Sequence, residues 1–267
     1  MRVVIETESG EAAGRVAGIV ADALRSNPRC VLGLAAGRTM EPVYAKLVES
    51  HEREGVSFRD VIAFNLDEYI GAAPSDEWSF QSFAFRHLVE PPDLPRSSLH
   101  VPSGAAEDVF EEARRYEETI RNSGGIDLQL LGLGRNGHLG FNEPGSSLGS
   151  RTRAKALTEA TLRANRDELP KLGDAAPQAA ITMGLGTILS ARSCLLLATG
   201  LAKASAVAAM IEGPVTSRVP ASVLQHHPEA TVVLDAAAAE RLEGRQYYQR
   251  AEQLQRQLER RGRSTRR

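Results

Sequence analysis

The sequence predicts an α/β fold: a single-domain, three-layer α/β/α arrangement around a mainly parallel, Rossmann-like sheet. Apolar runs of strand length alternate along the chain with longer stretches of helical period, which is the pattern of parallel strands joined by crossover helices. The strand-like runs are almost continuously apolar, as is typical of strands that helices cover on both faces. With 267 residues, 42% of them hydrophobic, the chain can bury one sizeable core.

The individual elements follow from these patterns in chain order. Strands are predicted at six apolar runs: RVVIE (2–6), CVLGLA (30–35), VIAFNL (61–66), IDLQLLG (126–132), SCLLLAT (193–199) and ATVVLD (230–235). Helical periodicity predicts helices at 11–25, 41–53, 80–89, 105–121, 202–211 and 236–243. Residues 91–98 and 167–177 contain the proline and polar residues that are typical of irregular surface connections.

The C-terminal end is basic. Residues 245–267 hold eight arginines against two glutamates, a net charge of +6, whereas the whole chain carries −2. A basic end of this kind can contact nucleic acid, but its apolar residues at helical spacing favour an amphipathic helix with a solvated tail. These apolar residues are Tyr247, Ala251, Leu254 and Leu258. We therefore predict a domain of residues 1–244 followed by a basic helix and tail, 245–267, and no nucleic-acid partner.

Several classes of protein are disfavoured by the composition. No segment approaches the roughly 18 uninterrupted apolar residues of a membrane span, and the N-terminus lacks the pattern of a signal peptide. We therefore expect a cytoplasmic protein with no membrane partner. The two cysteines, Cys30 and Cys194, each lie inside a strand-like run, where a thiol behaves as a small buried hydrophobe. Neither a disulfide nor a metal site is expected.

Ligands of open α/β sheets bind beyond the carboxyl ends of the strands, so the residues after each predicted strand are the informative ones. Gly37 and Thr39 follow the second run and precede a predicted helix, where free N–H groups can hold a phosphate, although a plain βα turn fits equally well. Lys203 lies in the first turn of another predicted helix. Cations are disfavoured at a helix N-terminus, so this lysine indicates either an anionic partner or a solvent-facing side chain.

Two adjacent carboxylates, Asp67 and Glu68, follow the third run. Side chains alternate in direction along an extended chain, so only one of them can point into a site. A carboxylate held there can act as a base toward a carbon-bound proton beside a carbonyl, provided that burial brings its pKa toward the working pH. The alternative is a pair of helix N-capping residues, since aspartate caps well.

The fourth run leads into LLGLGRNGHLGFNEPGSS, Leu130 to Ser147, which contains the spacing G-x-G-x-x-G. A dinucleotide-binding turn would need a helix to begin inside this stretch and an acidic residue about 20 positions further on. Pro144 disfavours the helix, and Ala154 and Lys155 are not acidic. The glycines more readily give backbone room for other residues to converge on a ligand.

Those residues are His138, Asn142 and Glu143. Histidine is suited to proton transfer near neutral pH, and a nearby carboxylate fixes its tautomer and raises its basicity. A single histidine in a loop is more often structural. A histidine five residues before a glutamate, at a glycine-rich strand end, favours chemistry.

Taken together, these strand ends resemble the glucosamine-6-phosphate deaminase family, also called glucosamine-6-phosphate isomerases. The resemblance runs from about Val31 to about Asp235, and its most specific pieces are FNLDEYIG, GLGRNGHLGFNEPGSSLGSRTR and AITMGLGTIL. It implies an enzyme that converts glucosamine 6-phosphate and water to fructose 6-phosphate and ammonia, without a cofactor or a metal. The expected place of such an enzyme is amino-sugar catabolism.

The resemblance also implies a role for each matching residue. His138, oriented by Glu143, would move the proton that opens the sugar ring, and Asp67 would carry the proton from C2 to C1. The phosphate and sugar would be bound by the remaining matched residues: Gly37, Arg38, Thr39, Glu68, Gly137 and Lys203.

The chain departs from the family pattern at three places. Many members have aspartate where this chain has Asn136, which can hydrogen-bond but cannot exchange protons, so a supporting role in catalysis is expected. The phosphate turn usually reads G-S/G-T-P, whereas here Arg38 and Met40 occupy the variable positions. A phosphate-binding arginine is expected where this chain has Asp167, and Arg166 is the neighbouring candidate to replace it.

Some members of the family are hexamers that N-acetylglucosamine 6-phosphate activates at a subunit interface. The corresponding residues here are Ser146, Arg153, Lys155 and a tyrosine at the C-terminal helix, Tyr247 or Tyr248. Cationic groups that converge with a hydroxyl can bind a second sugar phosphate. Alternatively, the SRTR segment shapes the wall of the active site.

Two rival functions stay open on the sequence. A 6-phosphogluconolactonase shares the fold and a similar glycine turn, but it typically continues ASLFP after the histidine and lacks the carboxylate of LDEY. A non-catalytic, sugar-phosphate-binding regulatory protein would keep the pocket without turnover, and Asn136 and Asp167 are the residues that suggest it.

Overall fold

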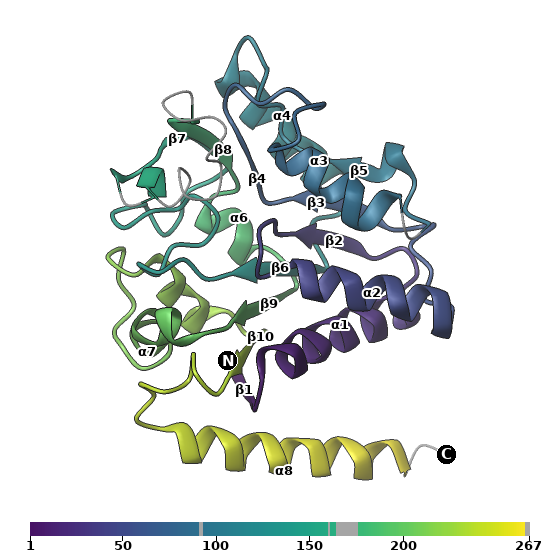
Figure 1. Ribbon diagram of the computed structural model, residues 1–267, viewed down its shortest axis with the longest axis vertical. Helices are drawn as coiled ribbons and strands as arrows, with labels where there is room; N and C mark the ends of the chain where they lie inside the picture. Colours follow the sequence, from purple (N-terminus) through teal and green to yellow (C-terminus); the bar gives the residue numbers. More distant parts are fainter. Residues whose placement is uncertain (91–92, 160, 164–175, 265–267) are drawn as a thin grey trace.

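A seven-stranded parallel sheet forms the centre of the fold, in the order β1-β10-β9-β6-β2-β3-β5. The computed structural model describes residues 1–90, 93–159, 161–163 and 176–264 (Figure 1). All six predicted strands are present: β1 (Arg2–Glu6), β2 (Val31–Leu34), β3 (Ile62–Asn65), β6 (Leu128–Gly132), β9 (Ser193–Ala198) and β10 (Ala230–Asp235). A short edge strand, β5 (Leu99–His100), was not predicted, since two residues carry no periodic pattern.

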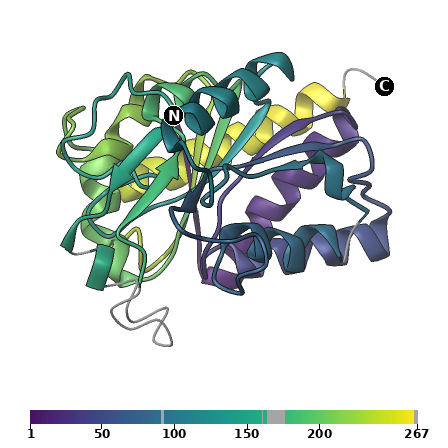
Figure 2. The ribbon, with the colours of Figure 1, turned by 90° about the horizontal axis from the view of Figure 1, so that it is seen from above.

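Helices cover both faces of this sheet, as the continuously apolar strands require. Helices α1 (Ser9–Ser26) and α2 (Glu41–Glu54) lie on one side, and α4 (Val109–Asn122) and α8 (Arg245–Ser264) lie on the other (Figure 2). The predicted three-layer α/β/α fold is therefore confirmed. Side chains of the central strands, among them Leu130, Leu131 and Leu196, are fully enclosed between the layers.

The remaining predicted helices are present with shifted ends, except one. Segment 80–89 is an α-helix, α3 (Phe80–Ala84), followed by a π-helical turn, Phe85–Val89, and α7 spans Ala204–Ile211. The prediction of a helix at 236–243 is wrong. The carboxylate of Asp235 accepts a 2.7 Å hydrogen bond from the amide of Ala238, and the segment forms a series of turns that continues to Gly244.

A second, three-stranded sheet in the order β4-β8-β7 was missed. Its strands are β4 (Asp67–Tyr69), β8 (Ala179–Thr182) and β7 (Arg153–Ala156), and both pairings are antiparallel. These strands are short and partly polar, so they lack the apolar runs that identified the others. The sheet has a direct consequence for the site: Thr182 pairs with Asp67 on one side and with Arg153 on the other.

The two cysteines are buried and free, as expected of thiols inside apolar strands. Burial raises the pKa of each thiol to about 12, so neither is a reactive thiolate near neutral pH. None of the helices in the described part of the chain has the length and apolar character needed to cross a membrane.

The C-terminal helix α8 begins at the expected residue and packs beside the edge strand β1 (Figure 1). Glu252 fixes this contact, because its carboxylate bonds Arg2 at 2.7 Å, Arg15 at 3.1 Å and Arg256 at 2.6 Å. Burial raises the pKa of Glu252, but the hydrogen bonds from Arg2 and Arg256 outweigh it, so that the pKa lies below its ordinary value. The division of the chain at residue 244 stays a prediction.

We predict that Glu252→Ala lowers the free energy of unfolding by about 2 kcal/mol, because three guanidinium groups lose a common buried partner. Thermal unfolding measures this loss. Glu259→Ala is the matched control, since Glu259 pairs with the same Arg2 but is 43% exposed, and it should cost less than about 0.5 kcal/mol. Equal losses in the two variants would refute the role of Glu252.

Candidate active site

The loop after β6 is folded tightly, so that His138 lies next to Gly134, near the beginning of the loop. The amide of Gly134 donates to the carbonyl of His138 at 2.9 Å, and the amide of Gly137 donates to the carbonyl of Gly134 at 3.0 Å. Gly137 has φ +82°, in the left-handed region that favours glycine. The helix that a dinucleotide-binding turn would need is absent here, as Pro144 indicated, and residues 133–150 form turns and irregular backbone.

Gly134 is required because the imidazole of His138 lies directly against it. A Cβ atom at position 134 would be 2.3 Å from Nε2 and Cδ2 of His138. Gly140, two residues after the histidine, makes a second close approach: a Cβ there would be 3.0 Å from Oδ2 of Asp67 and 2.7 Å from Oγ1 of Thr182. The loop that carries His138 therefore also packs on the carboxylate of Asp67.

His138 lies beside a buried carboxylate. Its Nδ1 atom is 3.4 Å from Oε2 of Glu143, and it makes no hydrogen bond to any described residue. Glu143 is 1% exposed, accepts a 2.8 Å hydrogen bond from Nδ2 of Asn136 on Oε2, and accepts a hydrogen bond from Thr161 on Oε1. Oδ1 of Asn136 in turn accepts from the backbone amide of His138 at 3.2 Å. Asn136 thus joins the histidine to its carboxylate.

This environment keeps Glu143 ionised. Burial raises the pKa of the Glu143 carboxyl, but the imidazole of His138 and the hydrogen bonds from Thr161 and Asn136 outweigh it and lower the pKa to about 2. An ionised carboxylate beside Nδ1 favours the tautomer with a proton on Nδ1 and stabilises the imidazolium. Nε2 is then the atom through which His138 can exchange a proton with a ligand.

Asp67 has the opposite electrostatic environment. It is the first residue of β4 and is 5% exposed, and burial together with the neighbouring charge of Glu68 raises its pKa well above the ordinary value. Its backbone is fixed by Asn65, whose Nδ2 donates to the carbonyl of Asp67 at 2.8 Å. A carboxylate with a raised pKa is a stronger base, as abstraction of a carbon-bound proton requires.

Glu68 has a structural role that differs from that of Asp67. Its carboxylate accepts hydrogen bonds from the amides of Tyr69, Phe80 and Gln81 at 2.9, 3.0 and 2.9 Å. Two of these amides belong to the first turn of α3, so Glu68 satisfies the N-terminus of that helix. We therefore reassign Glu68 from substrate binding to the positioning of α3 behind β4; the helix-capping alternative applies to this residue and not to Asp67.

The loops after β2 and β9 flank the histidine loop, because β6 lies between these two strands. Gly37 has φ +103°, and its carbonyl accepts from the amide of Met40, the residue before α2, at 2.9 Å. Within the described part of the chain, no side chain caps this helix N-terminus, so its amides can hold an anion. Thr39 is half-buried in the same turn and Arg38 is exposed.

Lys203, in the loop after β9, contacts the histidine loop on the side opposite to the loop after β2. Its Nζ donates to the carbonyl of Leu133, at the start of the histidine loop, at 2.6 Å. The segment before Lys203 is fixed by Asp235, whose two carboxylate oxygens accept from the amide of Gly200 at 3.0 and 2.9 Å. A cation and a helix N-terminus therefore lie on either side of the loop that carries His138.

Comparison with known proteins identifies the family of this chain. The family described as glucosamine-6-phosphate isomerases/6-phosphogluconolactonase matches residues 6–233. The chain belongs to this family. The glucosamine-6-phosphate deaminase of Hahella chejuensis is 50% identical over 93% of this chain and 94% of its own, and that of a Marinomonas species is 47% identical over 97% and 98%.

Solved structures of the family separate into two levels of similarity. A monomeric glucosamine-6-phosphate deaminase covers 90% of this chain and 100% of its own, with a TM-score of 0.88 and 41% identity. A 6-phosphogluconolactonase from Trypanosoma cruzi covers 91% and 97%, with a TM-score of 0.73 and 21% identity. The similarity to the lactonase establishes the fold alone, because the two sequences are only 21% identical. The similarity to the deaminase includes the sequence as well as the fold.

Among the residues that correspond to the family's activator site, Lys155 and Tyr247 are far apart within this chain. Lys155 lies on β7 and Tyr247 on α8, which are on opposite sides of the molecule (Figure 1). Ser146 is 2% exposed, and its hydroxyl has no hydrogen-bond partner among the described residues. Arg153 donates to Oδ1 of Asn142, in the loop that carries His138, at 2.9 Å. Both the activator site and the alternative interpretation of SRTR stay predictions.

Two further expectations complete the account of the family's residues. Arg166 lies outside the residues that the structure describes, so its role in phosphate binding stays a prediction. Among the described residues, no group of three His, Cys, Asp or Glu is placed to hold a metal ion.

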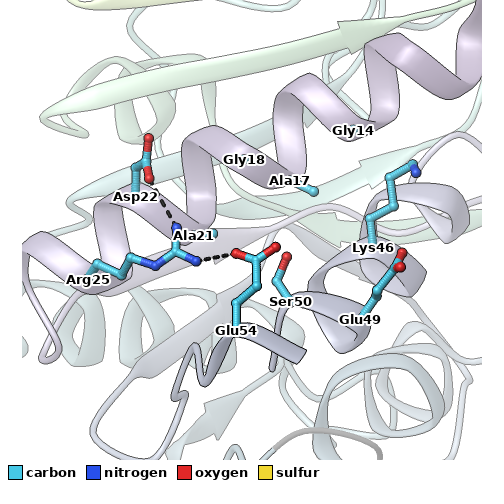
Figure 3. Close-up of a pocket in the computed structure, with 10 residues that line it drawn as sticks. All are labelled: Gly14, Ala17, Gly18, Ala21, Asp22, Arg25, Lys46, Glu49, Ser50 and Glu54. Atoms are coloured by element: carbon cyan, nitrogen blue, oxygen red, sulfur yellow. Dashed lines mark hydrogen bonds and ion pairs between the residues drawn. The ribbon is translucent and has the colours of Figure 1, made fainter. Parts of the chain in front are cut away.

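A separate groove between α1 and α2 has a volume of about 340 Å³ (Figure 3). It is lined by small and charged residues of α1, between Gly14 and Arg25, and by polar and charged residues of α2, between Lys46 and Glu54. Its arginine, Arg25, is already bonded to Asp22 and Glu54. The groove is therefore not the reaction site.

We predict that Gly134→Ala lowers kcat about a hundredfold, because the new methyl group displaces the imidazole of His138 and misplacement by about 1 Å can cost that much. Steady-state kinetics on the folded variant measures the loss. Gly149→Ala is the matched control, since a Cβ there meets no atom within 4 Å. A Gly134→Ala enzyme with unchanged kcat would contradict the proposed packing of His138.

Proposed function

We infer that this protein is a glucosamine-6-phosphate deaminase, which converts glucosamine 6-phosphate and water to fructose 6-phosphate and ammonia. The observation that carries this inference is the double packing of one glycine loop, on the imidazole of His138 through Gly134 and on the carboxylate of Asp67 through Gly140. An acid–base histidine and a separate basic carboxylate are the two groups that ring opening and proton transfer between adjacent carbons need. The 50% identical relative supports the same reaction.

The reaction begins with ring opening. Nε2 of His138 exchanges a proton with the ring oxygen, and Glu143 stabilises the charge that develops on the imidazole through Nδ1. Asn136 holds Glu143 in place through its hydrogen bond to Oε2. Because the amide of Asn136 cannot exchange protons, it acts as a support for this pair and gives no argument against turnover.

Asp67 carries out the second part of the reaction. Its carboxylate removes the proton from C2 of the open chain, which gives an enolamine, and returns that proton to C1. The product is an imine at C2, and water hydrolyses it to the ketose and ammonia. The raised pKa of Asp67 suits this step, since the group must take up a proton and release it within one turnover.

The phosphate gives remote binding energy that can hold the open chain in reactive geometry. We assign its binding to Gly37, Arg38, Thr39 and Lys203, with Gly137 beside the sugar, and we retain Arg166 as a candidate. A homo-oligomer such as a hexamer, activation by N-acetylglucosamine 6-phosphate and a cytoplasmic location remain proposals. The structural relative described as monomeric makes a monomer the competing expectation.

A coupled assay tests the function directly. We expect the protein to release ammonia from glucosamine 6-phosphate. We expect 6-phosphogluconolactone to be hydrolysed no faster than at the uncatalysed rate. Repetition with N-acetylglucosamine 6-phosphate measures activation. Lactone hydrolysis without ammonia release would favour the lactonase branch of the family, and tight binding of the sugar phosphate without turnover would favour a regulatory protein.

We predict that Asp67→Asn stops the exchange of the C2 proton with solvent, because an amide cannot act as the base. Nuclear magnetic resonance of the substrate in D₂O measures this exchange. In the wild-type enzyme the rate should rise with pH through the raised pKa of Asp67, well above the ordinary aspartate range. Persistent exchange in the variant would remove Asp67 as the base.

The same substitution should act on stability with a definite sign. A carboxyl whose pKa is raised in the folded state disfavours folding once the pH exceeds its unfolded-state pKa, and the cost is complete above the raised pKa. Asp67→Asn should therefore be more stable than the wild type at pH 8, and the difference should vanish near pH 3. Thermal unfolding at the two pH values makes this comparison.

A further inference from the structure

We propose that Thr161 is a positioning residue of the proton-transfer pair: its hydroxyl fixes the plane of the Glu143 carboxylate so that Oε2 faces His138. This proposal rests on the proposed function, in which His138 and Glu143 act together. Thr161 is 7% exposed and lies outside the motifs that carried the family resemblance.

The direction of the Thr161 hydroxyl is set by a second threonine. Thr158 donates its hydroxyl proton to Oγ1 of Thr161 at 3.2 Å, and its own oxygen accepts from the amide of Thr161 at 3.3 Å. Oγ1 of Thr161 is thereby an acceptor toward Thr158, so its own proton is directed to Oε1 of Glu143. The chain Thr158, Thr161, Glu143 has one consistent orientation of donors.

Each carboxylate oxygen of Glu143 consequently has its own donor. Thr161 bonds Oε1, and Asn136 bonds Oε2 at 2.8 Å. Two bonds on different oxygens prevent rotation of the carboxylate, and they leave Oε2 3.4 Å from Nδ1 of His138. Without the Thr161 bond, the group can turn about its last side-chain bond and carry Oε2 away from the imidazole.

The consequence for catalysis is electrostatic as well as geometric. Nδ1 of His138 is buried and has no hydrogen-bond partner among the described residues, and Oε2 of Glu143, 3.4 Å away, is the anionic atom beside it. Among the described residues, His138 is the titratable group that contacts the Glu143 carboxylate. Loss of the fixed carboxylate should therefore weaken proton transfer through the imidazole of His138 and lower kcat.

The test compares Thr161→Val, which keeps the shape but removes the hydroxyl, with Thr161→Ser, which restores it. For ammonia release from glucosamine 6-phosphate, Thr161→Val should lower kcat about tenfold, as expected of a lost hydrogen bond to a charged group, while KM stays within about twofold. The kcat–pH profile should change as well, because the pair of His138 and Glu143 loses its fixed geometry. Thr161→Ser should restore both quantities. Thr161→Ala repeats the test without a β-branched side chain.

Thr187→Val provides the matched control. Thr187 donates to the buried carboxylate of Glu117 in the same way as Thr161 donates to Glu143, but Glu117 does not contact His138. This control should lower the melting temperature and leave kcat and its pH profile unchanged. It separates the loss of a buried hydroxyl–carboxylate bond in general from the loss of this one.

Two outcomes would overturn the role of Thr161, and a third would refute the function on which it rests. An unchanged kcat and pH profile in Thr161→Val and Thr161→Ala would show that the hydroxyl is not needed. Equal impairment of the valine and serine variants would show that the effect is one of packing. Failure of the wild-type protein to release ammonia would refute the proposed function itself, whereas ammonia release that the valine variant matches would refute only the positioning role.

Discussion

The active site depends on one steric constraint: the loop after β6 contacts the imidazole of His138 at one point and the carboxylate of Asp67 at another, and both contact points are glycines. Gly134 leaves room for the ring of His138, and Gly140 leaves room for Oδ2 of Asp67. The left-handed backbone at Gly137 lets the loop turn between these two contacts. A methyl group at either contact would separate the acid–base histidine from the base that follows it in the reaction.

Two buried carboxylates in this site have opposite pKa shifts, and their partners explain the difference. Burial raises the pKa of both Asp67 and Glu143. Glu143 also receives hydrogen bonds from Thr161 and Asn136 and faces His138, and these interactions outweigh burial. Asp67 instead has the like charge of Glu68 as its neighbour. One carboxylate is therefore kept ionised to steer a histidine, and the other is poised to take up a proton.

The sequence predicts most of this fold because its strands are long apolar runs, whose burial leaves little choice of structure. The sequence does not predict the segments whose secondary structure is determined by tertiary contacts. Strands β4 and β7 are short and contain polar residues, so they become strands only by pairing with β8. Residues 236–243 have a helical composition, but the carboxylate of Asp235 bonds the segment into turns.

Prediction of the site shows the same division. The spacing of His138 and Glu143 and the position of Asp67 after a strand are visible as a motif. The role of Glu68 is not, because two of the three amides that it bonds belong to α3, more than ten residues away in sequence. Thr161 is likewise hidden, since a threonine near a distant glutamate leaves no periodic or spacing signal in the chain.

Asn136 illustrates how a departure from a family pattern can be consistent with function. An amide presents a donor to Oε2 of Glu143 and an acceptor to the backbone of His138, and it makes both bonds at the same time. An aspartate in this position would place a second carboxylate against Glu143, and one of the two would have to bind a proton to avoid like-charge repulsion. The asparagine removes that coupling. The low pKa of Glu143 then depends on donors that do not titrate near neutral pH, together with His138, the group whose protonation the catalytic step requires.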